Sequence, residues 1–577
     1  MKWKFFSVMK GKQLSDLAEV FVSFEVEKLD GCSVVYFNKV LSGAISSADV
    51  LDAYGYVVGP EPRRDFNQFP LKSFMAERYG GDGILNNGGG GRCGFDGVWQ
   101  LKGVGPNQLV GSDIDPSNVD GNLCLNTAIY ETIWSEIIQV ILPFGAIQTV
   151  AILDTGREYE SCGILKRRGL LIRQPAVRPA HFIRATYFRE KQLNALSKDA
   201  QRVKLAVRRL EEFLPGSATV TCSAYERIEL GLLELVKRYA EQFAVSNAKH
   251  IAHLNVTASN LSLDGAWLDL SGACLFTHLN IRDKLAVDRF NGEHIPAICS
   301  LQDICYYLCK YSVINYYEFT ILREKITKGF EQSYFSYLKF YQVAQAGFPC
   351  WVLKRIESSK EFALFSDVLS DFLKHDGFLV NPITLGECWA GYERWVARLY
   401  LDLLKGKVDK KPADFSWLNA DASIIDQLLS GFSELFDRAV EVADGHHVSL
   451  QNLYRCMLIN ITRLNRSHEL LHGLKDHIER IGNGPSVDRH TEYHELKNEA
   501  VRVAKFNFSI ENIISVSFWC GNESYIWFDP MTGMFTARVE NNHVMSSHSI
   551  FELAGCQKDV KTALRFYREI WSDFNEK

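Results

Sequence analysis

The 577-residue sequence lacks three features that would place it in a specialised class of protein. None of its 14 cysteines forms a CxxC pair, so the paired ligands of a zinc site are missing. Its longest apolar segment, 137–153, contains Gln139, Pro143, Gly145 and Gln148, which argues against membrane insertion. Neither sign of charge is in large excess, since the chain has 64 basic and 69 acidic residues. The formal charge of −5 argues against a nucleic-acid-binding protein, although a local basic patch would be compatible with it.

These absences predict a globular protein of the cytoplasm. Hydrophobic residues make up 47% and charged residues 23% of the chain, which excludes a wholly disordered protein. We expect the scattered cysteines, including Cys305 and Cys309 on an apolar helix, to be reduced core residues. The N-terminus starts with charges like a signal peptide, but its apolar stretch ends at Lys10 and is too short for one.

Periodicity divides the chain into three parts. Residues 1–190 mix strands and helices, residues 191–484 are mainly helical apart from a strand-and-loop passage at 253–276, and residues 485–577 form a small α+β module. The main predicted strands are 33–37, 99–102, 150–153 and 169–173, followed by an alternating stretch at 513–539. The main predicted helices are 126–141, 191–213, 230–243, 301–314, 334–343 and 559–574.

Glycines gather between residues 80 and 94, although the 41 glycines of the chain are an average number. Such a segment lets the backbone approach a phosphate and point its N–H groups inward. A mobile surface loop is the alternative interpretation.

Charged residues follow the glycines in an order that also occurs in kinases. Lys102 ends a predicted strand and Glu131 lies on the next helix, as in kinases, where such a lysine neutralises phosphate. Arg173 and Arg178 suit bidentate phosphate contacts. The alternative for all of these residues is a solvated surface charge.

A passage from His253 to Gly272 contains two hard-oxygen ligands suitable for Mg²⁺. Asn260 and Asp269 flank a short hairpin, and the sequence from Asp269 has the outline of the metal-binding segment of kinases. Turn and capping roles are the alternative for both residues.

The order of these segments resembles the selenoprotein O (YdiU-type) family of kinase-like proteins over roughly residues 65–280. Three separate segments match: the family's QLKG motif at 100–103, its R…R-F-G-(H/T)-F segment at Arg173 and 177–182, and its H-G-V-M-N-T-D-N-M-S segment, aligned without gaps at 253–269. Asp120 and Glu131 also keep the family's separation, since 131 − 120 = 11. The segment after about residue 485 and the family's redox residue near the C-terminus find no match.

The resemblance implies an α+β, bilobal protein-kinase-like fold, with a mixed β-rich N-lobe, a mainly helical C-lobe and an added C-terminal module. It implies that ATP binds in a flipped orientation together with Mg²⁺ and that AMP is transferred to protein hydroxyls. Phosphate or nucleotide contacts would come from Gly89, Gly91, Arg92, Lys102, Asp120, Gly121, Arg173 and Arg178. Glu131 would pair with Lys102, and Asn260 and Asp269 would hold Mg²⁺.

Ser259 departs from the family, which has an aspartate as general base at this position. Serine cannot act as a base without help. The favoured interpretation is an adenylyltransferase whose acceptor is a carboxylate, such as a peptide C-terminus in peptide or microcin maturation, activated as an acyl-adenylate for a partner acyltransferase subunit. The alternatives are an inactive nucleotide-binding pseudokinase or scaffold, and AMPylation of hydroxyls by another base, with Asp264 as a substitute. A nucleotide-independent interaction protein that uses the C-terminal module is the remaining class.

Overall fold

The computed structural model of the chain describes residues 12–59, 71–81, 88–111, 120–185, 195–216, 223–276, 284–374, 391–409, 414–418, 420–484, 489–510, 514–521, 524–538, 544–554 and 558–574. No helix within these ranges has the length and apolar character needed to cross a membrane.

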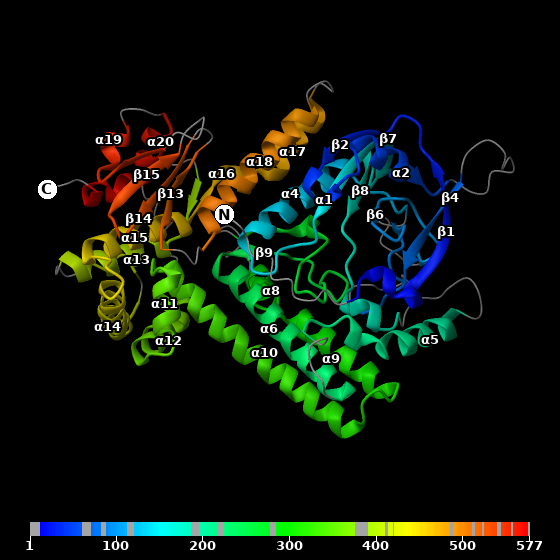
Figure 1. Ribbon diagram of the computed structural model, residues 1–577, viewed down its shortest axis with the longest axis horizontal. Coiled ribbons are helices and arrows are strands. Elements are labelled where there is room, and N and C mark those ends of the chain that lie inside the picture. The colour runs from blue at the N-terminus through cyan, green and yellow to red at the C-terminus, as the bar shows by residue number, and fades with distance from the viewer. Residues whose placement is uncertain are drawn as a thin grey trace.

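An eight-stranded sheet dominates the N-terminal part (Figure 1). Every neighbouring pair is antiparallel, in the order β2-β7-β8-β6-β5-β4-β1-β3. The strands are β1 (Phe21–Lys28), β2 (Ser33–Phe37), β3 (Tyr56–Val57), β4 (Leu71–Glu77), β5 (Cys93–Phe95), β6 (Gln100–Lys102), β7 (Thr149–Ser161) and β8 (Ile164–Arg173). Cys162 and Gly163 join the β7–β8 hairpin with positive φ angles of 54° and 75°, which suit a tight two-residue turn. The predicted strands of this region are confirmed.

Helix α4 (Leu125–Ile141) lies between the sheet and the helices of the later chain (Figure 1). Ile133, Trp134 and Ile137 are buried on it, and the helix contacts β7 and β8 as well as α17 (Leu474–Asn483) and α18 (Arg489–Phe508). The predicted helix at 126–141 is confirmed. The apolar segment 137–153 is the end of this helix, a turn and the start of β7, as expected from its proline and glycine.

Helices make up most of the chain between the two larger sheets, as predicted. They are α5 (Ala195–Val207), α6 (Ala224–Ala248), α8 (Lys284–Asn291), α9 (Ile295–Lys310), α10 (Tyr316–Gln345), α11 (Cys350–Ile356), α12 (Lys360–Leu373), α13 (Val396–Asp409), α14 (Ala422–Asp444), α15 (Leu450–Leu464) and α16 (Glu469–His472), followed by α17 and α18. Capping boxes begin α6 at Ser223 and α10 at Asn315. The passage between α6 and α8 holds the short strands β9 (Ile251–Ala252) and β10 (Cys274–Leu275), also as predicted.

A second sheet of four antiparallel strands lies near the C-terminus. It consists of β13 (Val516–Cys520), β14 (Tyr525–Asp529), β15 (Met534–Arg538) and β16 (Val544–Ser547), paired in sequence order. The helices α19 (Ile550–Ala554) and α20 (Lys558–Phe566) and the 3-10 segment η9 (Arg568–Phe574) follow it. Phe518 of β13 stacks on Tyr567, with ring centroids 4.5 Å apart. The predicted α+β character of this region is confirmed.

Two large hydrophobic cores run through the described residues. One joins the first sheet and α4 to α5, α6, α9 and α10 and to α16–α18, and the other joins α11–α15 to the second sheet. α18 contributes to both, through Leu496 and Phe506. The boundaries 1–190, 191–484 and 485–577 stay predictions of the sequence.

Removing the Trp134 side chain tests the role of α4 as the layer between sheet and helices. Trp134 is completely buried, so Trp134→Ala is expected to lower the free energy of unfolding by about 3–5 kcal/mol. Val140→Ala, on the exposed side of the same helix, should cost less than about 1 kcal/mol. Urea denaturation midpoints measure both effects, and equal losses would contradict this packing.

Candidate functional site

Lys102 lies buried between two carboxylates from distant parts of the chain. Its Nζ atom is 2.7 and 2.9 Å from the two carboxylate oxygens of Glu131 and 2.7 Å from Oδ1 of Asp269. Only 2% of Lys102 and 5% of Glu131 are exposed, so the interpretation of these residues as solvated surface charges is wrong. The predicted pairing of the strand lysine with the helix glutamate is confirmed.

Successive side chains of β6 point to opposite faces of the sheet, and this explains why Lys102 faces α4. Leu101 packs in the apolar core on one face of the sheet, so Gln100 and Lys102 project from the other face. Arg173 of β8 is the register partner of Gln100 and projects from the same face. The strand register therefore brings a lysine, a glutamine and an arginine together.

Both predicted arginines join this cluster. The guanidinium of Arg173 donates to Oδ1 of Asp269 at 2.9 Å and to the side-chain oxygen of Gln100. Arg178 donates to the same glutamine oxygen at 3.1 Å and to the carbonyl of Ser259 at 3.0 Å. Both arginines are at most 3% exposed, so a surface role is wrong for them too.

Asp269 is the acidic centre of the cluster. Burial alone would raise the pKa of its carboxyl, but the charges of Arg173, Lys102 and Arg178 hold it well below its usual range. The Asp269 backbone is left-handed, with φ of 60°, at the start of the 3-10 segment Leu270–Gly272. Asp269 therefore has the turn and capping position that was expected from the sequence as its alternative role, and it also bonds to Lys102 and Arg173.

Glu77 and His181 extend the cluster beyond the predicted residues. Glu77, at the end of β4, accepts from the amide of Gln100 and lies 3.1 Å from Nε2 of His181. His181 Nδ1 accepts from the backbone of Arg178, so its other nitrogen carries the proton. Burial lowers the pKa of His181; it would raise that of Glu77, but the His181 bond and the Arg178 charge bring the carboxyl below its usual value. The sequence offers a weak signal for His181 in its motif and none for Glu77.

The segment carrying Asn260 and Asp269 is fixed by two buried residues. His253 bonds through Nε2 to the carbonyl of Leu268, 3.1 Å away, which closes the segment on itself. Glu293 accepts from the backbone N–H groups of both His253 and Leu254. Burial lowers the pKa of His253 to about 4 and raises that of Glu293 to about 7. Sequence reasoning missed Glu293, which lies outside every motif.

Among the residues that the structure describes, no base contacts the hydroxyl of Ser259. Its oxygen lies 2.9 Å from the hydroxyl of Thr257 and 3.3 Å from the side-chain oxygen of Asn260. Asn260 also donates to the carbonyl of Asn255 at 2.7 Å, so its amide is oriented by the backbone. Asp264, the conceivable substitute, has an exposed side chain in the hairpin turn, where its carbonyl accepts from Arg238 of α6.

The glycines that were predicted at the nucleotide are packed against the backbone. Residues 88–91 are buried, so a surface loop is the wrong interpretation there, whereas 82–87 lie outside the described residues. An added Cβ at Gly89 would lie 2.1 Å from the carbonyl oxygen of Glu77, and one at Gly91 would lie 2.7 Å from Val110. Gly89 therefore needs to be glycine for the fold itself, whereas a side chain at position 91 would displace Val110.

The remaining predicted residues lie near the end of β6. The carbonyl of Arg92 accepts from Gly103, the residue after Lys102, at 3.0 Å. Gly121, with φ of 64°, accepts from Gly105, and the carboxylate of Asp120 accepts from the N–H of Asn122 at 2.9 Å. The backbone thus brings these residues close to the strand of Lys102.

The cluster fits an anionic ligand. Nη2 of Arg173 and Nε of Arg178 are buried and have no hydrogen-bond partner among the described residues, so both can donate to an anion. No group of three or more His, Cys, Asp or Glu residues in the described part of the chain could hold a metal ion. Asn260 and Asp269 could supply at most two protein ligands, which suits Mg²⁺ completed by phosphate oxygens and water.

Comparison with known proteins assigns no family to this chain, since no protein-family model and no curated protein matches it. The resemblance stated from the motifs stays a prediction.

Replacing Glu293 tests how the metal-ligand segment is held. Its pKa of about 7 lies above the unfolded value of roughly 4.3, so the contribution of this group to stability is complete below pH 4.3 and is lost as the pH rises through about 7. Glu293→Gln keeps the acceptor oxygen and removes the titration. We expect the stability difference between variant and wild type to shift by about 3 kcal/mol in favour of the variant from pH 4.5 to pH 8. Urea midpoints across this range measure it, and a pH-independent difference would contradict the assignment.

Proposed function

We propose that the chain binds ATP with Mg²⁺ at this cluster and transfers AMP to a carboxylate, such as the C-terminus of a peptide. The observation that carries the proposal is the convergence on Asp269 of a strand lysine and a strand arginine, with Glu131 holding the lysine from α4. Lys102 and Asp269 are separated by 167 residues in the chain, so the fold brings them together.

The proposal includes a finer description of the fold. Residues 1–190, with the first sheet and α4, would be the N-lobe, and the mainly helical residues 191–484 the C-lobe, of a kinase-like bilobal protein that resembles the selenoprotein O family. A buried lysine–glutamate pair between a strand and a helix supports this, as does an aspartate that follows a short hairpin.

The donors of the cluster are held in place before any ligand arrives. Gln100 orients both arginines, and Glu131 orients Lys102. Donors that need no reorientation stabilise charge that develops on a phosphate group most effectively. Asn260 and Asp269 would hold Mg²⁺, which supplies further positive charge at the phosphates.

A carboxylate acceptor accounts for Ser259. A carboxylate is ionised at neutral pH, so it needs no base to attack the α-phosphate. A carboxylate oxygen would form a bond to the α-phosphorus while the bond to the bridging oxygen of the β-phosphate breaks. Pyrophosphate leaves with the electron pair, and no proton moves. The product is an acyl-adenylate, which a partner acyltransferase subunit would use.

A nucleotide-binding pseudokinase is the second candidate. Glu131 and Asp269 together already neutralise Lys102 and Arg173, so the cluster is satisfied electrostatically without turnover. AMPylation of hydroxyls is less favoured, because the contacts of the Ser259 oxygen are a hydroxyl and an amide. The two candidates share nucleotide binding and differ only in chemistry.

Thermal unfolding tests nucleotide binding. ATP with Mg²⁺ at 100 times its dissociation constant should stabilise the chain by about 2.7 kcal/mol and raise its melting temperature. Asp269→Asn and Lys102→Met should remove this increase, each measured against its own ligand-free melting temperature. Lys166→Met, on β8 of the same sheet, should keep it. Failure of ATP and Mg²⁺ to raise the melting temperature of the wild type would leave a purely structural ion cluster and favour a nucleotide-independent interaction protein.

Labelled ATP separates the two candidates. The assay uses a pool of peptides without acidic side chains and a matched pool with amidated C-termini, both in the presence of hydroxylamine. Acyl-adenylation predicts pyrophosphate release and trapped hydroxamate with free C-termini only, and a change of less than about twofold in Ser259→Ala. Transfer of label to the peptide from the γ position alone would contradict AMP transfer. Nucleotide binding without turnover in either pool would favour the pseudokinase.

A further inference from the structure

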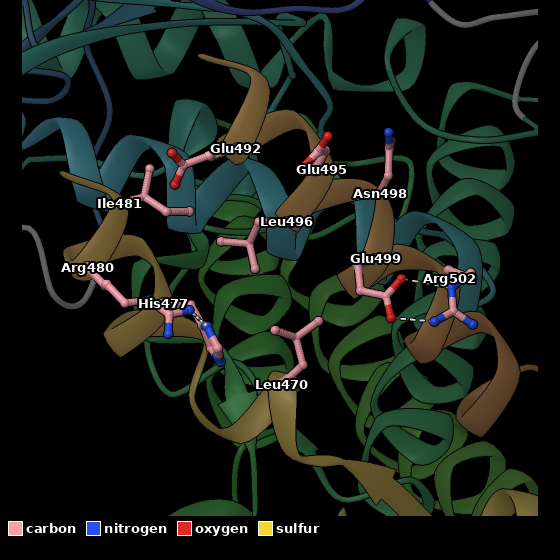
Figure 2. A pocket seen from close by; sticks show the side chains of 10 residues that line it. All are labelled: Leu470, His477, Arg480, Ile481, Glu492, Glu495, Leu496, Asn498, Glu499 and Arg502. Carbon is pink, nitrogen blue, oxygen red and sulfur yellow. Dashed lines mark hydrogen bonds and ion pairs between the residues drawn. The ribbon is translucent and has the colours of Figure 1, made fainter. Parts of the chain in front are cut away.

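A groove of about 740 Å³ lies between the short helix α16, α17 and α18, away from the charged cluster (Figure 2). Leu470, Ile481 and Leu496 form its apolar floor, and each is 8–9% exposed. Figure 2 shows Leu470 and Leu496 pointing toward one another across it. The floor is therefore apolar but narrow.

The two walls of the groove carry opposite charges. His477 and Arg480 line it from α17, and Glu492, Glu495 and Glu499 line it from α18. Arg480 bonds to the ring of His477, and no acid of the described ranges pairs with it. Within the described part of the chain, Glu492 and Glu495 make no ion pair, whereas Glu499 is neutralised by Arg502.

The groove has the length and form of a helix-binding surface. Glu492, Glu495, Glu499 and Arg502 follow one another at spacings of three or four residues, so they form one line along α18. That line is about 15 Å long at 1.5 Å per residue, and the ten residues of α17 have the same length. Ridges of side chains on two neighbouring helices leave a groove into which a third helix packs.

We propose that this groove binds an amphipathic α-helix of a partner protein, about three turns long. The partner helix carries an apolar stripe toward Leu470 and Leu496, lysine or arginine on the edge against α18, and a carboxylate on the edge against Arg480. The exposed rims set the orientation and the choice of partner, because complementary charges favour one pairing and repel the reverse. This inference does not depend on nucleotide chemistry.

Both long helices that form the groove, α17 and α18, also contact α4. Lys475 of α17 lies 5.0 Å from the ring centroid of Tyr130 on α4, and Tyr493 of α18 lies 3.5 Å from Asn126 of α4. Tyr130 directly precedes Glu131, the partner of Lys102. A helix bound between α17 and α18 would therefore contact the two helices that pack on α4, which carries Glu131.

A display selection on the full-length chain tests the proposal. The library consists of helical peptides with a fixed leucine stripe and edge positions randomised among lysine, glutamate and glutamine. We expect the wild type to enrich peptides with lysine on one edge and glutamate on the other. The double variant Glu492→Lys/Glu495→Lys should enrich glutamate on the edge where the wild type takes lysine. Both substituted residues are exposed, so the variant should keep the wild-type melting temperature.

A matched control separates the groove from overall charge. The double variant Glu331→Lys/Asp426→Lys, at exposed positions on α10 and α14, changes the net charge equally and should enrich the wild-type peptides. In fluorescence anisotropy, an enriched synthetic peptide should bind the groove variant about tenfold more weakly than the wild type, and the control within about twofold. No enrichment, or the same peptides from all three proteins, would overturn the proposal. Self-association of the wild type that the groove variant abolishes would also overturn it, because the occupant would then be a second copy of the chain.

Discussion

A lysine ammonium buried at the end of a strand has to be neutralised where it lies, and Lys102 imposes this requirement on the structure. Glu131 and Asp269 meet it from a helix and from a hairpin segment. Removing one partner of a buried pair leaves an uncompensated charge, at a cost of about 3–5 kcal/mol. The strand, the helix and the hairpin are therefore constrained to one mutual arrangement, and a displacement of any of them exposes or isolates a charge.

Each partner of Lys102 is also held by contacts that lie outside the charged cluster. The sheet and the α17–α18 pair enclose α4 from two sides. His253 and Glu293 fix the hairpin segment through its backbone, and Gln100 joins the two arginines through one oxygen. A neutral amide in this central position orients two cations without adding another buried charge, which would need its own partner.

Sequence reasoning found the elements of the cluster wherever order along the chain carries information. Lys102 at a strand end and Glu131 on the next helix were predictable because both elements have clear periodicity. Glu77 and Glu293 were not, because an isolated glutamate carries no sign of burial and its partners lie far away in the sequence. Tyr493 packs on Asn126, 367 positions away in the chain, and no local sequence pattern predicts this contact. Gly89 was assigned to a ligand, yet the backbone of β4 already requires a glycine there.

Three buried cations lie near Ser259, whose hydroxyl contacts a hydroxyl and an amide. This combination bears on which acceptor the proposed reaction would use. A hydroxyl acceptor is neutral and needs a base, but it approaches a triphosphate without charge repulsion. A carboxylate acceptor needs no base, yet two anions must meet, so positive charge at the phosphates has to offset their repulsion. In the proposed function, Lys102, Arg173 and Arg178 would donate to the phosphates at a buried site, where charge is screened least, and Mg²⁺ would add positive charge that their carboxylate partners do not cancel. A serine without a neighbouring base among the described residues, together with three buried cations, is thus the combination that the proposed ionised acceptor would require.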